Sequence, residues 1–131
     1  MLERGHVVRF YYLWKRQAQA GEESGRKARP VCIAIRTKDI PGSVYLFPIT
    51  SQQPDEDRLS LAFNQIECRR AGLRFPCWII LDEYNLVALD KAYDLEDIRP
   101  LGSVSPAFLV EMARTIKEAA AIGRLSGVKR S

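Results

Sequence analysis

The sequence predicts a mainly β domain with one C-terminal helix, folded as a small and partly open barrel. Through the first two-thirds of the chain, short apolar segments rich in β-branched and aromatic residues alternate with turn-forming residues. This pattern is typical of about five or six short strands. In the last third the apolar residues recur at helical spacing instead. One amphipathic helix is therefore expected to pack on the strands.

Length and composition limit the classes to which the chain can belong. Its 131 residues, 47% of them apolar, suffice for one domain over residues 1–131 with a core that needs no disulfide or metal. No apolar run is long enough to span a membrane and residues 1–4 do not resemble a signal peptide, so a cytoplasmic protein is expected. The three cysteines form no C-x-x-C pair, which predicts neither a disulfide framework nor a metal site, and no cofactor is expected. The formal charge of +4 favours a polyanionic partner.

The first half of the chain alternates expected strands and loops. Residues 5–14 form the first strand, because aromatic and β-branched side chains recur at every second position. Residues 15–28 are polar and contain two glycines, which predicts a long flexible loop. Residues 30–35 are apolar on both faces and are expected to form a central strand. A turn at residues 39–42 then leads into a third strand at residues 43–47.

The middle of the chain continues in the same way after a second polar loop at residues 51–57. Residues 59–64 alternate apolar and polar side chains, which is the period of a half-buried strand. Residues 67–76 contain arginines and a glycine and are expected to form a turn-rich connection. Residues 78–81 should form a buried strand that ends in an acidic pair, and residues 86–89 a further short strand.

Ser105 and Pro106 predict where the C-terminal helix begins, as its N-cap and its first residue. Gly123 predicts where the helix ends, and residues 126–131 are expected to be disordered. The apolar stripe that should face the strands consists of Leu109, Met112, Ala113, Ile116 and Ala120.

Two short motifs place phosphate-compatible side chains at strand ends. Arg29 precedes Pro30, and a proline restricts the residue before it to extended backbone, so the guanidinium is presented from a defined position. Thr50 belongs to the motif Pro48-Ile49-Thr50-Ser51 that closes the third strand, and its β-branched side chain has few χ1 choices. A planar cationic fork and a fixed hydroxyl, both held by rigid strands, are suited to gripping one phosphodiester.

The chain carries five short motifs in the order Gly5-His6-Val7-Val8, Arg29-Pro30-Val31, Pro48-Ile49-Thr50-Ser51, Ile80-Leu81-Asp82-Glu83 and Leu101-Gly102-Ser103-Val104-Ser105. Their order and spacing resemble the MazF/PemK family of bacterial toxins, from residue 5 to about residue 125. Members of that family, including PemK-like growth inhibitors, belong to toxin-antitoxin systems. The resemblance therefore implies an SH3-like barrel of the MazF/PemK/CcdB type.

The same resemblance implies a metal-independent endoribonuclease, a hydrolase of single-stranded RNA that works as a homodimer and is neutralised by a cognate antitoxin. It implies that Arg29 and Thr50 are the main catalytic residues. The 2′-hydroxyl of the substrate would attack phosphorus and leave a cyclic phosphate and a 5′-hydroxyl. Arg29 would stabilise the developing negative charge and Thr50 would donate to a non-bridging oxygen.

Further residues are assigned by their chemistry and by departures from the family pattern. Glu23 and Glu83 are candidate proton acceptors, with ordinary surface carboxylates as the alternative, because arginine is a poor base. Glu83 and Asn85 replace a glutamine and an arginine of the family, which removes one cation. His6 is the only histidine and is expected to be structural. The expected RNA-binding residues are Arg26, Lys27, Ser51 and Gln52.

Two other hypotheses remain open at the level of sequence. In the first, the barrel is a non-catalytic MazF/CcdB-fold module that binds nucleic acid or a protein partner. In the second, Arg29 pairs with Asp82 or Glu83 on the surface and Thr50 caps a strand. The arrangement of Arg29 and Thr50 separates these hypotheses from the nuclease, which requires both side chains in one exposed hollow.

Overall fold

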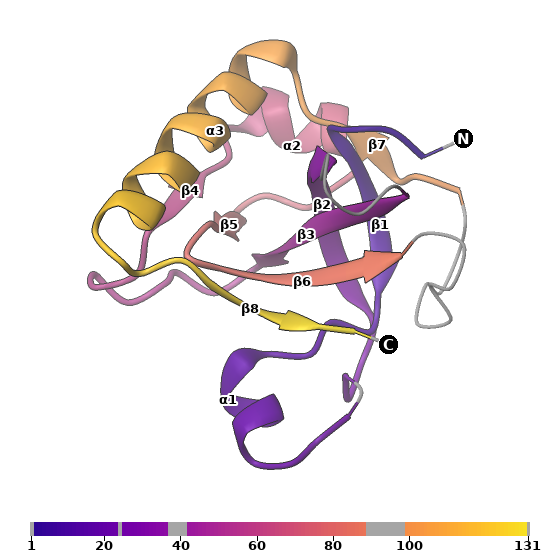
Figure 1. Cartoon of the computed structure of the whole chain (residues 1–131). Coiled ribbons are helices and arrows are strands. Elements are labelled where there is room, and N and C mark those ends of the chain that lie inside the picture. The colour runs from indigo at the N-terminus through magenta and orange to yellow at the C-terminus, as the bar shows by residue number, and fades with distance from the viewer. Residues whose placement is uncertain (1, 24, 37–41, 89–98, 131) are drawn as a thin grey trace.

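The computed structural model describes residues 2–23, 25–36, 42–88 and 99–130, and it consists of one curved sheet with helices against it (Figure 1). The helix α3 lies across one side of the sheet, with α2 beside it, whereas α1 projects from the opposite end. The strands are β1 His6–Phe10, β2 Arg29–Arg36, β3 Ser43–Thr50, β4 Ser60–Ala62, β5 Trp78–Ile80, β6 Glu83–Ala88, β7 Gly102–Ser103 and β8 Ser126–Lys129. The helices are α1 Lys15–Gln19, α2 Gln65–Ala71 and α3 Pro106–Ala121.

Strand β3 is the hub of the sheet because it pairs with three other strands. Along one edge it pairs with β2. Along the other edge its first residues, from Ser43 to Leu46, pair with β6, while its last residues, Ile49 and Thr50, pair with β5. The described pairings are antiparallel except that between β6 and β8. The change of partner along one strand closes the sheet into a half-barrel, as the sequence predicted for a mainly β fold with a C-terminal helix.

Both faces of the central strands are buried, which explains the continuous apolar sequence of β2. In β1, Val8 and Phe10 face one core and Val7 faces the other, as the two-residue period of a strand requires. The strand-side core consists of Val8, Phe10, Tyr12, Trp14, Val31, Ile33, Val44, Leu46, Ile80 and Val87. The helix-side core includes Val7, Cys32, Phe47, Cys68, Ile79, Leu81, Met112 and Ile116.

Helix α3 begins where the sequence predicts. The hydroxyl of Ser105 accepts a hydrogen bond from the N–H of Phe108 at 3.1 Å, and Pro106 is the first helical residue. The buried carboxylate of Glu67, on α2, accepts from both the N–H and the hydroxyl of Ser105, each at 2.7 Å. The N-cap therefore also joins the two helices.

The buried face of α3 differs in part from the predicted stripe. Met112 and Ile116 are buried as expected, but Ala119 is buried in place of its neighbour Ala120. Ala113 is exposed as well. The helix ends at Ala121, shortly before Gly123, which has a φ of 71°.

The prediction of a turn-rich connection over residues 67–76 is wrong for its first half, which belongs to α2. Asn64 caps this helix by accepting from the N–H of Glu67 at 2.7 Å, and Gly72 ends it in the left-handed conformation with a φ of 72°. The exposed arginines of α2 obscure its helical period in the sequence. Its buried residues are Glu67, Cys68 and Ala71.

The prediction of disorder over residues 126–131 is also wrong, because Ser126–Lys129 form β8. The N–H of Arg130 donates to the carbonyl of Leu86 on β6 at 2.8 Å. Its guanidinium donates to the carbonyl of Tyr11 at 2.9 Å and lies over the ring of Phe10. Contacts with distant strands hold this segment, which has little apolar character of its own.

The remaining predicted elements are close to the observed ones. The expected loop over residues 15–28 contains the short helix α1 and otherwise no regular structure in its described part. The expected turn at residues 39–42 lies outside the described residues except for Gly42, and residue 89 of the last expected strand lies outside them too. None of the described helices is long and apolar enough to cross a membrane.

Candidate functional site

The pairing of β2 with β3 brings Arg29 and Thr50 together. Val31 lies opposite Pro48, so extending this register by two residues places Arg29 opposite Thr50. Both side chains line one pocket of about 340 Å³, which we call the first pocket. It sits at the end of the strand-side core, whose residues Trp14 and Ile80 form part of its wall. The other lining residues are Arg16, Lys27, Ser51, Gln52, Gln53, Pro54, Asp55 and Arg58.

Arg29 is half-buried, and none of the described carboxylates serves as its counter-ion. Its guanidinium lies over the ring of Trp14, 4.9 Å from the ring centre. Burial, followed by the positive charge of Arg16, lowers the pKa of Arg29 from its ordinary value. No carboxylate among the described residues forms an ion pair with it. An anion that enters the first pocket would therefore relieve an uncompensated charge.

The hydroxyl of Thr50 is oriented by its own loop. The N–H of Gln52 donates to Thr50 Oγ1 at 3.1 Å. This bond occupies an acceptor site of the oxygen and leaves the O–H free to donate. Arg29 and Thr50 thus both present donors to the same space.

The predicted RNA-binding residues do not all lie in the pocket. Lys27, Ser51 and Gln52 line it, whereas Arg26 does not and forms an exposed ion pair with Glu22 at 2.8 Å. The pocket residues absent from the prediction are Trp14, Arg16, Gln53, Pro54, Asp55, Arg58 and Ile80. Asp55 lies in the polar loop after β3, and its place in the loop that follows Thr50 could have indicated it. Asp55 is the only acidic residue among the described residues that line this pocket.

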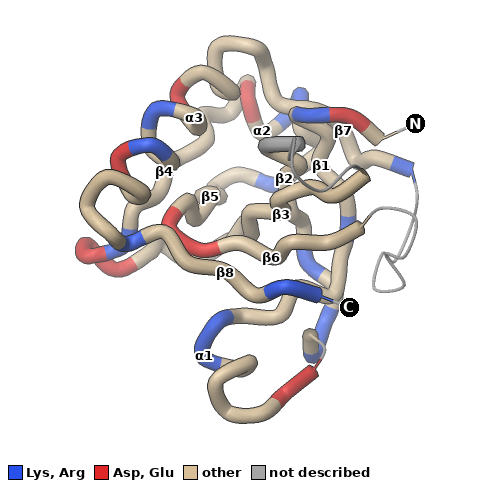
Figure 2. Tube along the Cα trace, in the orientation of Figure 1, with Lys and Arg blue, Asp and Glu red and all other residues tan. Residues whose placement is uncertain are grey.

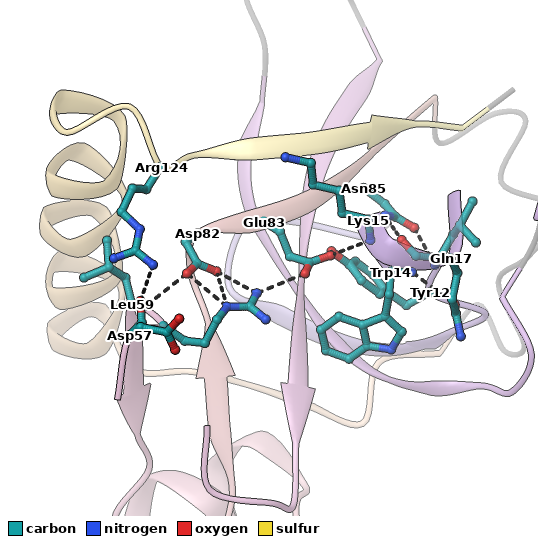
Figure 3. A network of polar contacts seen from close by, with 12 residues as sticks. Tyr12, Trp14, Lys15, Gln17, Asp57, Leu59, Asp82, Glu83, Asn85 and Arg124 are labelled. Carbon is teal, nitrogen blue, oxygen red and sulfur yellow. Dashed lines mark hydrogen bonds and ion pairs between the residues drawn. The ribbon is translucent and has the colours of Figure 1, made fainter. Parts of the chain in front are cut away.

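Glu83 lies outside the first pocket, in a buried polar network (Figure 3). Its carboxylate accepts from the hydroxyl of Tyr12 at 3.0 Å, the N–H of Lys15 at 3.0 Å and the guanidinium of Arg58 at 2.9 Å. Arg58 also binds Asp82, with its shortest contact at 2.7 Å. Arg58, and not Arg29, is therefore the partner of this acidic pair, which removes the hypothesis that Arg29 pairs there.

The network shifts the pKa values of its members. The hydrogen bonds that Arg58 donates to the carboxylate of Asp82 raise the pKa of Arg58. Burial, together with the nearby charge of Glu83, raises the pKa of Tyr12 well above its ordinary value. Tyr12 and Arg58 therefore both keep their protons at any physiological pH.

Asn85 has a structural role next to this network. It is fully buried and clasps Leu13, accepting from its N–H at 2.9 Å and donating to its carbonyl at 2.7 Å. The guanidinium of Arg130 also donates to Asn85 at 2.9 Å. A cation is thus present beside Asn85 after all, supplied by the residue that follows β8.

Glu23 and His6, the two remaining candidates from the sequence, do not line the first pocket. Glu23 is exposed and is not among the residues that line it. His6 accepts from the N–H of Glu3 at 2.8 Å through Nδ1, which stabilises the turn before β1. Of the described side chains, no group of three or more His, Cys, Asp or Glu is arranged to hold a metal ion.

Comparison with known proteins identifies the fold. No protein-family model matches the chain, and no curated protein matches its sequence. One solved structure, described as an endoribonuclease in complex with its cognate antitoxin from a mycobacterial species, matches with a TM-score of 0.63. The match covers 93% of this chain and 97% of that one, at 18% identity. The likeness confirms the predicted fold class, a mainly β half-barrel sheet with a C-terminal helix.

Proposed function

We propose that this protein is a metal-independent endoribonuclease that cleaves single-stranded RNA. The observation that carries the proposal is the convergence of Arg29 and Thr50 on the first pocket. A half-buried arginine with no carboxylate partner among the described residues favours an anion, and a phosphodiester matches its planar fork. The fold likeness to a protein described as an endoribonuclease supports the same conclusion.

In the proposed reaction the 2′ oxygen of the RNA bonds to phosphorus while the bond from phosphorus to the 5′ oxygen breaks. The products are a 2′,3′-cyclic phosphate and a 5′-hydroxyl, with the proton of the 5′-hydroxyl taken from solvent. Negative charge builds on the non-bridging oxygens in the transition state. Arg29 and the free O–H of Thr50 would donate to those oxygens.

Asp55 is the proposed acceptor of the 2′ proton, because it is the one carboxylate among the described lining residues. Glu83 is committed to its three donors and Glu23 does not line the pocket, so neither takes this role in the proposal. Asp55→Asn is expected to lower kcat by about a hundredfold, the lower end of general-base effects. An unchanged kcat would exclude Asp55 as the base.

The proposal includes a homodimer and an antitoxin as partners. Four cations line the first pocket, namely Arg16, Lys27, Arg29 and Arg58, and the chain is positively charged overall. An acidic, partly disordered segment of an antitoxin would bind there and block the RNA. Co-purification with a small acidic protein, and the mass of the free protein in solution, test these two partners.

The direct test uses the purified protein, free of any antitoxin, with a chelator present. It should cut single-stranded RNA and spare DNA of the same sequence, because DNA lacks the 2′-hydroxyl that attacks. Mapping of the new ends should find cyclic phosphates and 5′-hydroxyls. Binding of RNA without any cleavage would instead support the non-catalytic module.

A further inference from the structure

A second pocket, of about 390 Å³, lies on the other side of Arg29 and Thr50. The two pockets share Lys27, Arg29, Thr50 and Ser51, so these residues form a ridge with a hollow on each side. The charged residues around α1 and the start of β2 are mostly basic, apart from one acidic stretch (Figure 2). A polyanion bound at the ridge would therefore extend into both pockets.

The second pocket differs from the first in its chemistry. Its wall is largely apolar and comes from Pro30, Ile49, Leu73, Cys77 and Leu101. Its charged lining residues are the cations Arg9, Lys27, Arg29 and Arg74, with no acidic residue among the described ones. A ligand that fits both features has a flat apolar part and a negative charge beside it, as a nucleoside with its phosphate does.

Several contacts within the fold hold the wall of the second pocket. The N–H of Leu73 donates to the carbonyl of Cys68 at 2.9 Å, which closes the end of α2. Gly72 packs so closely against Leu101 that a Cβ there would collide with the carbonyl oxygen of Leu101. The sulfur atoms of Cys68 and Cys77 lie 3.2 Å apart in the helix-side core. The wall of the hollow is thus anchored to α2 and to the helix-side core.

We propose that the second pocket binds the nucleoside next to the scissile phosphate. Its base lies against Leu73 and Leu101, and the following phosphate is bound by Arg74, an exposed side chain at the rim. This proposal rests on the proposed function only for the position of the scissile phosphate on the ridge. The pocket itself would bind any single-stranded nucleic acid, because its phosphate and base contacts do not require the 2′-hydroxyl.

The test measures binding separately from cleavage. The probe is a fluorescent single-stranded DNA of mixed sequence, about twelve nucleotides long, which the protein binds but does not cut. Arg74→Ala should weaken its binding roughly tenfold and reduce the slope of log affinity against log salt by about one. Leu101→Glu should weaken binding at every salt concentration, since it places a negative charge where the base lies. The matched control, Arg114→Ala on α3, removes an exposed arginine that lines neither pocket and should bind as wild type.

The outcomes separate the two proposals. If the wild type cuts RNA but Arg74→Ala and Leu101→Glu bind the DNA as tightly as wild type, the subsite is wrong and the nuclease stands. If the wild type cuts no RNA but both variants lose affinity, the subsite stands as a nucleic-acid surface and the nuclease is wrong. If the two variants change the mass of the protein in solution and leave the affinity intact, the hollow is an interface between copies, which overturns the subsite. Thermal unfolding of each variant identifies any loss that comes from misfolding.

Discussion

Arg29 and Arg58 line the same pocket, yet they differ in their counter-ions and in the direction in which their pKa values are shifted. Arg58 is bound by two buried carboxylates, which raise its pKa, whereas Arg29 is bound by none among the described residues and has a lowered pKa. The charge of Arg58 is therefore compensated within the fold, whereas no described carboxylate compensates the charge of Arg29. Under the proposed function, the counter-ion of an arginine, more than its exposure, distinguishes the structural cation from the one that binds a ligand.

The largest expected effect is on catalysis, from Arg29→Ala. Loss of one donor that stabilises a transition-state charge typically lowers kcat by about two to three orders of magnitude, and the same is expected here. Stability should hardly change, because no ion pair among the described residues is broken. Cleavage of single-stranded RNA and chemical denaturation measure the two effects, with Arg114→Ala as the control. Unchanged turnover would remove Arg29 from the mechanism.

Arg58→Ala is expected to affect the stability of the fold strongly, in contrast to Arg29→Ala. It leaves the carboxylates of Asp82 and Glu83 buried without their cation, which should lower the free energy of unfolding by about 3 kcal/mol. The estimate is at the low end for a buried pair because part of the Arg58 side chain is exposed. Urea denaturation gives the value. If Arg58→Ala lowered the free energy of unfolding by less than Arg29→Ala does, the structural role of Arg58 would be contradicted.

A smaller effect is expected at Thr50, whose hydroxyl is one donor among several. Thr50→Val keeps the shape of the side chain but removes the O–H, and kcat should fall by roughly tenfold, as for a single neutral hydrogen bond. Thr50→Ser should restore most of the rate, because it keeps the hydroxyl that Gln52 orients. Equal rates for valine and serine would show that the hydroxyl does not contact the reacting group.

The smallest expected effect comes from Tyr12→Phe, in the network around Arg58. Removing the hydroxyl takes one donor from Glu83 and should lower the free energy of unfolding by about 1 kcal/mol at pH 7. Because burial raises the pKa of Tyr12, the unfolded chain releases its phenolic proton near pH 10 while the folded chain retains it. Wild-type stability should therefore fall as the pH rises above 10, and the variant should escape that part of the loss. Urea denaturation between pH 7 and 11 shows whether the free energies of unfolding of the wild type and the variant approach each other.

Features that depend on local sequence could be predicted well. Arg29 begins β2 and Thr50 ends β3, which are neighbouring antiparallel strands. Their proximity therefore follows from the two motifs and the order of the strands. Ser105 and Pro106 identified the start of α3 for the same local reason. Helix α2 was missed because its short apolar face is interrupted by arginines that favour a loop in the sequence.

Features that depend on long-range contacts could not be predicted. Strand β8 pairs with β6, about forty residues earlier, and its own residues have little strand propensity. The partners of Glu83 are Tyr12, Lys15 and Arg58, which precede it in the sequence by 71, 68 and 25 residues. No pattern in a single sequence pairs Arg58 with Glu83 in preference to Arg29. Which arginine pairs with Glu83 depends on how the whole sheet packs.

The ridge of Lys27, Arg29, Thr50 and Ser51 has a consequence for the topology of a substrate. The described residues enclose neither flanking hollow, so under the proposed function a strand of RNA can be laid across the ridge from the side and no terminus has to be threaded. A covalently closed circle of RNA would be admitted as readily as an open molecule of the same sequence. Its first scission would yield one full-length linear product.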